Sequence, residues 1–97
     1  METPAANGTV NGLRGIPHDN IDDADRWISD PLKRGILRSL SDDDLLKSVY
    51  NPDDGTHMTY WDDIMMEGNH RMAELLRRAD DPASSITNDT PIYVDGW

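Results

Sequence analysis

A turn in the last third of the chain combines residue types that bind anions. It reads Glu67-Gly68-Asn69-His70-Arg71 and directly follows a run rich in aromatic and β-branched residues. A glycine at this point lets the backbone turn tightly or approach a ligand closely. The first N–H groups of a helix have no intrahelical partner, so a phosphate there would accept backbone hydrogen bonds, and Arg71 could add a bidentate contact. We therefore predict a phosphate-binding turn over Gly68, Asn69, His70 and Arg71.

The charge balance singles out the same part of the chain. The sequence has 97 residues, with 9 Lys and Arg against 19 Asp and Glu, and a formal net charge of -10. Residues 68–79 hold three arginines and one glutamate, whereas the segments on either side are acidic. A surplus of negative charge repels a nucleic-acid backbone, which argues against a DNA-coating protein. The local excess of positive charge after Gly68 is where an anion is expected.

Hydrophobic spacing predicts the elements that would hold this turn. Residues 56–66 are β-prone and predict a strand. Gly68-Asn69 then opens a helix, and Asp80-Asp81-Pro82 closes it. The apolar stripe of this helix, which has to be buried, consists of Met72, Leu75, Leu76 and Ala79. The β-prone run 91–94 is expected to return beside the first strand as its parallel neighbour.

The preceding residues predict helices after a loose leader. Residues 1–20 contain scattered Pro and Gly without a helical or strand period, which indicates a flexible leader. Residues 21–40 predict two short helices broken by a proline. Ser41 is expected to cap a third helix, because a serine side chain can accept a hydrogen bond from a free N–H of the first turn. The three aspartates that follow it favour the positive end of a helix dipole and support the same start. We expect a single small α+β domain over residues 21–97.

The turn and its flanks resemble the signature of the ParB/sulfiredoxin-like superfamily. Members of that superfamily carry G-x-H-R or G-x-x-R between a strand and a helix, and this chain reads Glu67-Gly68-Asn69-His70-Arg71-Met72-Ala73, followed by a strand-forming run at 90–94. The resemblance covers about Tyr60 to Val94. It implies that Gly68, Asn69, His70 and Arg71 cradle nucleotide phosphates. Asn69 stands where the sulfinic acid reductases of the superfamily carry a nucleophilic Cys, which excludes that activity.

The resemblance to ParB-like nucleases implies a hydrolase of nucleic-acid phosphodiester or nucleotide phosphate bonds, of the kind used as toxin modules. In that case His70 acts as general acid or base, and Arg71 holds charge that develops on the phosphoryl oxygens. Glu67 or Asp63 positions a water or a divalent metal such as magnesium. The implied partners are a nucleotide or a nucleic-acid phosphate. The resemblance names no metal ligand beyond these carboxylates.

A second class of function stays open. Asn69 can serve as a helix cap, Arg71 can pair with Glu74, and Arg77 and Arg78 can complement the negative end of the helix, all without a ligand. The surplus of carboxylates then favours a non-catalytic acidic interaction protein, such as an adaptor, an inhibitor or a nucleic-acid mimic, that binds a basic protein partner.

The other chemistry-bearing residues favour structural roles. A metal site made by His57, His70 and a carboxylate is possible in composition, but its spacing matches no local two-histidine motif. The absence of cysteine excludes disulfides and thiolate ligands. We assign the methionines to core packing, and the tryptophans to packing rather than base stacking. No apolar run is long enough for a membrane span, and no secretory signal is present, so we expect a soluble, cytoplasmic protein that does not bind membranes.

Overall fold

The computed structural model describes residues 3–16, 36–52, 55 and 57–97. These residues form an α+β domain, as predicted. Its elements in chain order are β1 (Gly8–Thr9), the 3-10 helix η1 (Val10–Leu13), α3 (Asp42–Tyr50), β2 (Thr59–Trp61), β3 (Ile64–Glu67), α4 (Asn69–Ala79) and β4 (Pro91–Ile92). Residues 36–39 are also helical. Of the two helices predicted over 21–40, the part over 21–35 lies outside the described residues.

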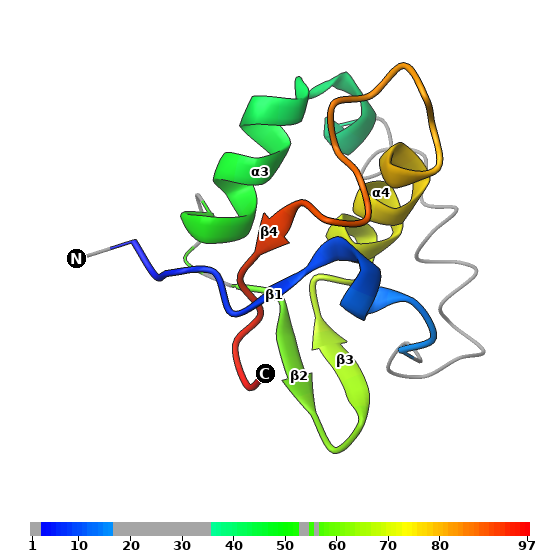
Figure 1. The fold of residues 1–97 in the computed structure, drawn as a ribbon. Coiled ribbons are helices and arrows are strands. Elements are labelled where there is room, and N and C mark those ends of the chain that lie inside the picture. Colours follow the sequence, from blue (N-terminus) through cyan, green and yellow to red (C-terminus); the bar gives the residue numbers. More distant parts are fainter. Residues whose placement is uncertain (1–2, 17–35, 53–54, 56) are drawn as a thin grey trace.

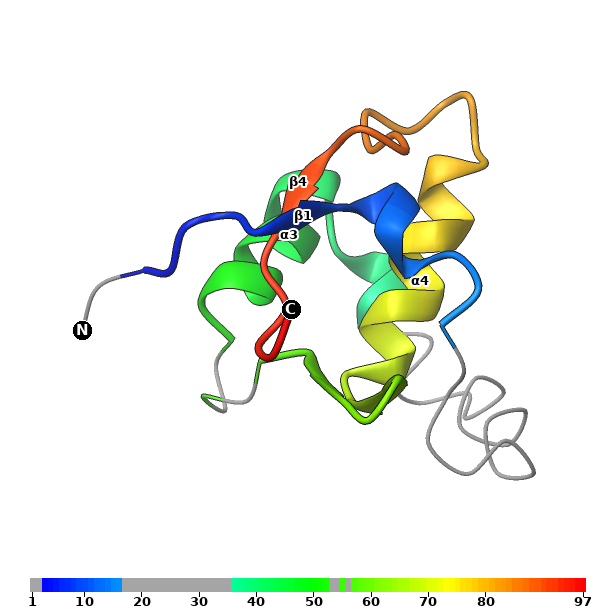
Figure 2. The ribbon, with the colours of Figure 1, turned by 60° about the horizontal axis from the view of Figure 1, so that its bottom comes forward.

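The elements divide the molecule into two ends. Figure 1 shows α3 and α4 at one end and the β2–β3 hairpin projecting from the other, with β1 and β4 between them. In the second view η1 lies against α4 (Figure 2). The core between these elements consists of Val10, Leu13, Leu45, Val49, Met58, Met65, Met72, Leu75, Ile86, Ile92 and Val94. Among the described residues, no helix is long and apolar enough to cross a membrane.

Two predicted helices are confirmed with their local signals. Ser41 is the N-cap of α3, and its hydroxyl oxygen accepts a hydrogen bond from the backbone N–H of Asp44 at 3.1 Å. The aspartates of the first turn lie against the positive end of the helix dipole. In α4 the predicted stripe packs into the core, where Met72 and Leu75 are fully buried. Both helices were predictable because each depends on contacts within a few residues.

The predicted single strand over 56–66 is wrong, because the chain reverses within it. The strands β2 and β3 are antiparallel, with Trp61 paired to Ile64. The two residues between them, Asp62 and Asp63, have positive φ values of 53° and 64°. A two-residue loop with positive φ at both positions matches the twist of a hairpin, and aspartate tolerates this region better than most residues that carry a Cβ.

The predicted parallel partner of the first strand is also wrong for residues 91–92. They form β4, which pairs antiparallel with β1 through Gly8 to Ile92 and Thr9 to Pro91. A parallel bridge occurs further along, between Thr59 and Asp95. There the N–H of residue 60 donates to the carbonyl of Asp95, and the N–H of Asp95 donates to the carbonyl of residue 58, each at 2.8 Å. The C-terminal segment therefore joins the two small sheets.

The predicted leader over 1–20 is wrong where it is described. Val10 and Leu13 are fully buried core residues. Asn7 extends the β1–β4 pairing with its side chain, which donates to the carbonyl of Val94 at 2.8 Å and accepts from the N–H of Val94 at 3.0 Å. Residues 17–20 of the predicted leader lie outside the described residues.

The glycines of this segment serve close packing. A Cβ at Gly8 would collide with the ring of Trp97, and one at Gly12 would come within 2.9 Å of the same ring. Only glycine lets the backbone pass this closely to an indole. The backbone at Gly8 and Gly12 therefore packs closely against the ring of Trp97.

Replacing Leu13 by alanine tests whether this segment belongs to the core. A fully buried leucine leaves a cavity when truncated, so we expect Leu13→Ala to lower the free energy of unfolding by roughly 2–4 kcal/mol in chemical denaturation. Ile36→Ala is the control: because Ile36 is 55% exposed, its truncation should lower the free energy of unfolding much less. A loss for Leu13→Ala no larger than that of the control would mean that residues 10–13 do not contribute to the fold.

Candidate functional site

The predicted phosphate turn lies between β3 and α4, as the sequence indicated. Gly68 is the N-cap of α4 with a φ of 84°, and no side chain caps this helix. A Cβ at Gly68 would come within 2.5 Å of Cγ and 3.0 Å of Cα of Met58. The glycine is therefore required by its left-handed conformation and by the buried methionine beside it.

Arg71 is directed toward the end of the neighbouring helix. Its Nη1 donates to the carbonyl of Ser48 at 3.0 Å. Nε2 of His57 lies 3.0 Å from the carbonyl of Tyr50, to which it donates in the appropriate tautomer. Carbonyls in the last turn of a helix have no intrahelical donor, so both side chains satisfy acceptors at the C-terminus of α3. Residues predicted for phosphate or metal binding thus have structural contacts.

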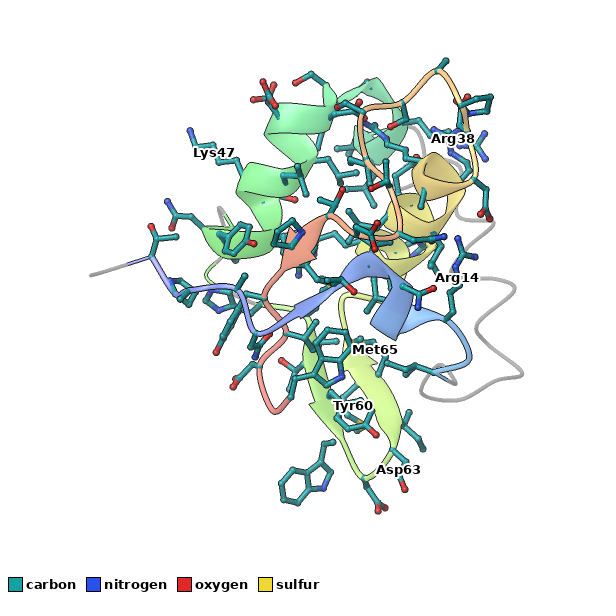
Figure 3. The ribbon with its side chains drawn as sticks, in the orientation of Figure 1. Arg14, Arg38, Lys47, Tyr60, Asp63 and Met65 are labelled. Atoms are coloured by element: carbon teal, nitrogen blue, oxygen red, sulfur yellow. The ribbon has the colours of Figure 1, made fainter. Side chains whose placement is uncertain are left out.

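The other predicted site residues are only partly brought together. Asn69 and His70 begin α4, and Nε2 of His70 is shielded from solvent. Glu67 is exposed at the end of β3, next to the turn. Asp63 lies beyond the opposite end of that strand, at the tip of the hairpin (Figure 3), about 13 Å along the chain from Glu67 by the rise of an extended strand. Asp63 therefore does not share a site with the turn.

No metal centre is formed within the part of the chain that the structure describes. No group of three or more His, Asp or Glu side chains there is placed to hold an ion. The contact with the carbonyl of Tyr50 also occupies one of the two ring nitrogens of His57.

A buried arginine at the other end of α4 was missed by the sequence analysis. Arg78 is only 6% exposed. Its Nε donates to Glu74 at 3.3 Å, and its Nη1 donates to Asp42 at 2.9 Å. Its Nη2 donates to the carbonyls of Leu37 and Leu40 at 2.9 and 2.7 Å. A buried charge requires such compensation, so Arg78 fixes the end of α4 to the start of α3.

Asp42 extends this network to the loop that follows α4. Besides Arg78, its carboxylate accepts hydrogen bonds from the hydroxyls of Ser84 and Ser85 and from the backbone N–H of Ser85. The N–H of Ser85, followed by the Arg78 guanidinium, holds the pKa of Asp42 well below its usual range. Asp42, which was predicted to complement the helix dipole, therefore also connects α3 with α4 and with this loop.

Glu74 organises two further arginines at the surface. It is 5% exposed, and its carboxylate accepts from Nε of Arg77 at 3.0 and 2.8 Å. This hydrogen bond raises the pKa of Arg77. Nε of Arg38 lies 3.9 Å from the same carboxylate, too far for a hydrogen bond. Glu74 thus orients Arg77 and attracts Arg38 to the same place.

These arginines border a surface depression of about 300 Å³, called here the arginine hollow. It is lined by Arg38, Leu40, Ser41, Asp42, Arg77, Arg78, Asp81, Ala83 and Ser84. Three arginines and two aspartates in this lining give it a small positive excess, in a chain whose net charge is -10.

The hairpin presents a surface of a different kind. Trp61 is 72% exposed beside the turn formed by Asp62 and Asp63. The hydroxyl of Tyr60 donates to Asp63 at 2.9 Å, and this bond raises the pKa of Tyr60. We call residues 60–66 the hairpin tip; it includes the partly exposed Met66. An exposed tryptophan flanked by carboxylates combines apolar contact area with negative charge.

Comparisons of the chain with protein-family models, with curated proteins and with solved structures find no match. The ParB/sulfiredoxin-like resemblance therefore stays a prediction that depends on the motif alone.

Gly68→Ala separates packing at the predicted turn from the intrinsic cost of a left-handed residue. Gly15 is the matched control, because its φ is 82° and a Cβ there would meet nothing within 4 Å. Denaturation should show a loss of about 1 kcal/mol for Gly15→Ala. For Gly68→Ala we expect roughly 2–4 kcal/mol, since the Cβ also displaces a core residue. Equal losses would show that contact with Met58 does not constrain this position.

Proposed function

We propose that this chain is a non-catalytic acidic interaction protein that binds a basic protein through the hairpin tip. The observation that carries the proposal is the 72% exposure of Trp61 next to the adjacent aspartates of the turn. Tryptophan is enriched among the residues that dominate binding energy at protein interfaces, and its large amphipathic ring can fill a pocket on a partner.

The backbone of the hairpin supports a binding role. Asp62 and Asp63 occupy positions with positive φ, where glycine or asparagine is commoner. Both aspartates therefore adopt an unfavourable backbone conformation, and the turn that they form places two carboxylates beside the indole. Complementary charge of this kind accelerates association and selects against acidic partners.

The rest of the chain supports a basic partner. The net charge is -10, and Asp43, Asp44 and Glu67 are among the exposed carboxylates outside the turn. Exposed charges act over about 10 Å at 0.1 M salt, so they guide a cationic surface toward the molecule before contact. The hairpin tip then supplies the apolar contact that a charged surface alone lacks.

Capture of proteins from a cell extract on the immobilised chain, followed by affinity measurement on the captured partner, tests the proposal. We expect a partner with an isoelectric point above about 9 that salt releases. Trp61→Ala should weaken its affinity by roughly tenfold or more, because it removes the central aromatic contact. Asp62→Asn with Asp63→Asn should mainly slow association and flatten the salt dependence.

Asp43→Asn with Asp44→Asn is the matched control, since it removes the same charge from an exposed site at the start of α3. Asparagine also tolerates positive φ, so the hairpin variants keep their turn. An affinity that falls equally in both charge variants and is unchanged in Trp61→Ala would reject the hairpin tip as the contact.

Phosphate binding at Gly68, Asn69, His70 and Arg71, with hydrolysis in the manner of ParB-like nucleases, is the second candidate function. One observation favours it: α4 begins without a side-chain cap and has no acidic residue in its first turn, in contrast to α3. Such a helix start is electrostatically suited to an anion. The contact of Arg71 with Ser48 is a structural alternative for the arginine.

Amide NMR of the full chain during addition of ATP, with and without magnesium, tests this second candidate. Binding at the predicted turn should shift residues 68–73 and should be lost in Arg71→Ala. Thermal denaturation of the same variant measures its structural role separately. A folded spectrum without shifts at 68–73 would reject the phosphate turn, and with it the catalytic roles of Glu67, His70 and Arg71.

A further inference from the structure

We propose that the arginine hollow binds a small oxyanion, a phosphate or carboxylate group, between the guanidinium groups of Arg38 and Arg77. This inference is independent of the proposed hairpin contact and of the predicted turn at Gly68. The arginine hollow lies at the opposite end of α4 from that turn, about 15 Å away by the rise of an eleven-residue helix.

The guanidinium of Arg77 is oriented and still has donors available. Its Nε and Nη2 bind Glu74, the latter at 2.6 Å, while its side chain is 44% exposed. Within the part of the chain that the structure describes, its Nη1 donates no hydrogen bond. The carboxylate behind it therefore holds the planar group in place and leaves the outer edge for a ligand.

Arg38 provides the second cation. Its side chain is 51% exposed. Among the described residues it pairs with Glu74, whose Oε1 lies 3.9 Å from Nε of Arg38. A guanidinium has five N–H donors, and among the described residues none of those of Arg38 makes a hydrogen bond. Glu74 thus brings two cations together, and the oriented guanidinium of Arg77 can receive an oxyanion at little cost in reorganisation.

Arg78 and Asp42 form the floor rather than the binding groups. The donors of Arg78 are directed at Glu74, Asp42 and two carbonyls. The oxygens of Asp42 accept from Arg78, Ser84 and Ser85, so its negative charge is locally compensated. The floor is therefore rigid and close to neutral.

Asp81 is the group that opposes an anion. It lines the arginine hollow, and its Oδ1 accepts from the N–H of Ala83 at 2.9 Å. Asparagine can keep this hydrogen bond through its own Oδ1 while removing the charge. The proposal therefore predicts that Asp81→Asn strengthens binding, whereas a merely structural hollow gives no such gain.

Titration of the full chain with inorganic phosphate, and separately with succinate, followed by amide NMR at constant ionic strength, tests the proposal. We expect saturable shifts around residues 38, 77 and 81–84. Arg38→Gln should weaken binding roughly tenfold, because a charge-assisted hydrogen bond is lost. Asp81→Asn should strengthen it several-fold. Tighter phosphate binding would indicate a phosphoryl ligand, and tighter succinate binding would indicate a carboxylate.

Lys47→Gln is the matched control, since it removes one positive charge on the far side of α3 from Arg38 (Figure 3). It should leave the affinity unchanged. The proposal is overturned if the shifts do not saturate, if they survive Arg38→Gln undiminished, or if Lys47→Gln weakens them equally. Shifts confined to residues 68–73 would also overturn it and would assign the anion to the start of α4. The spectrum of each variant reports in the same experiment whether the fold is intact.

Discussion

The buried guanidinium of Arg78 is the constraint on which the arrangement of the helices depends. It joins the end of α4 to the start of α3, while Arg71 joins the start of α4 to the end of α3. The two arginines are seven residues apart, and their acceptors, Asp42 and Ser48, are six apart. At 1.5 Å per helical residue these spacings differ by only about 1.5 Å. Two long side chains thus hold two helices at both ends and in opposite chain directions, and the loss of a partner of Arg78 would leave a charge buried without compensation.

The burial of some arginines between the helices determines which guanidinium groups stay exposed to solvent. Arg71 and Arg78 each donate a hydrogen bond to α3, whereas Arg38 and Arg77 are half exposed beside Glu74. Partly exposed guanidinium groups therefore lie at the helical end of the molecule, which also carries the exposed Asp43 and Asp44. The hairpin end, whose position Figure 1 shows, carries the exposed indole of Trp61 beside Asp62 and Asp63, and residues 59–67 hold no Lys or Arg. The two ligands that we propose, a small anion and a cationic protein surface, therefore belong to opposite ends of the molecule.

The sequence was sufficient where the signal was local. The cap at Ser41 and the apolar stripe of α4 predicted both helices because their determinants lie within one or two turns. The hairpin was missed because its turn is Asp62-Asp63, which lacks the glycine that usually marks such a reversal. The supposed leader was missed because Gly8 lies against Trp97, a partner at the other end of the sequence, and a glycine required by close packing has the same one-letter signature as a flexible one. The candidate site was partly misplaced for a related reason: the acceptors of Arg71 and Arg78 include backbone carbonyls, which have no sequence signature.

The anchoring of the hairpin supports the binding role that we propose for its exposed tryptophan. The backbone of β2 is held on both sides, by β3 and by hydrogen bonds to Asp95, and the backbone of Gly96 lies directly against the carbonyl of Tyr60. Met65 anchors the inner face of the hairpin in the core, where it is fully buried, whereas the side chain of Trp61 is 72% exposed. Because the backbone is fixed in advance, only the side chain of Trp61 would have to be ordered when it enters a partner's pocket. An indole exposed on a loose loop would lack this advantage. The fixed backbone, the exposed aromatic ring and the adjacent carboxylates together support the proposed recognition of a partner, rather than a tryptophan that has merely failed to pack.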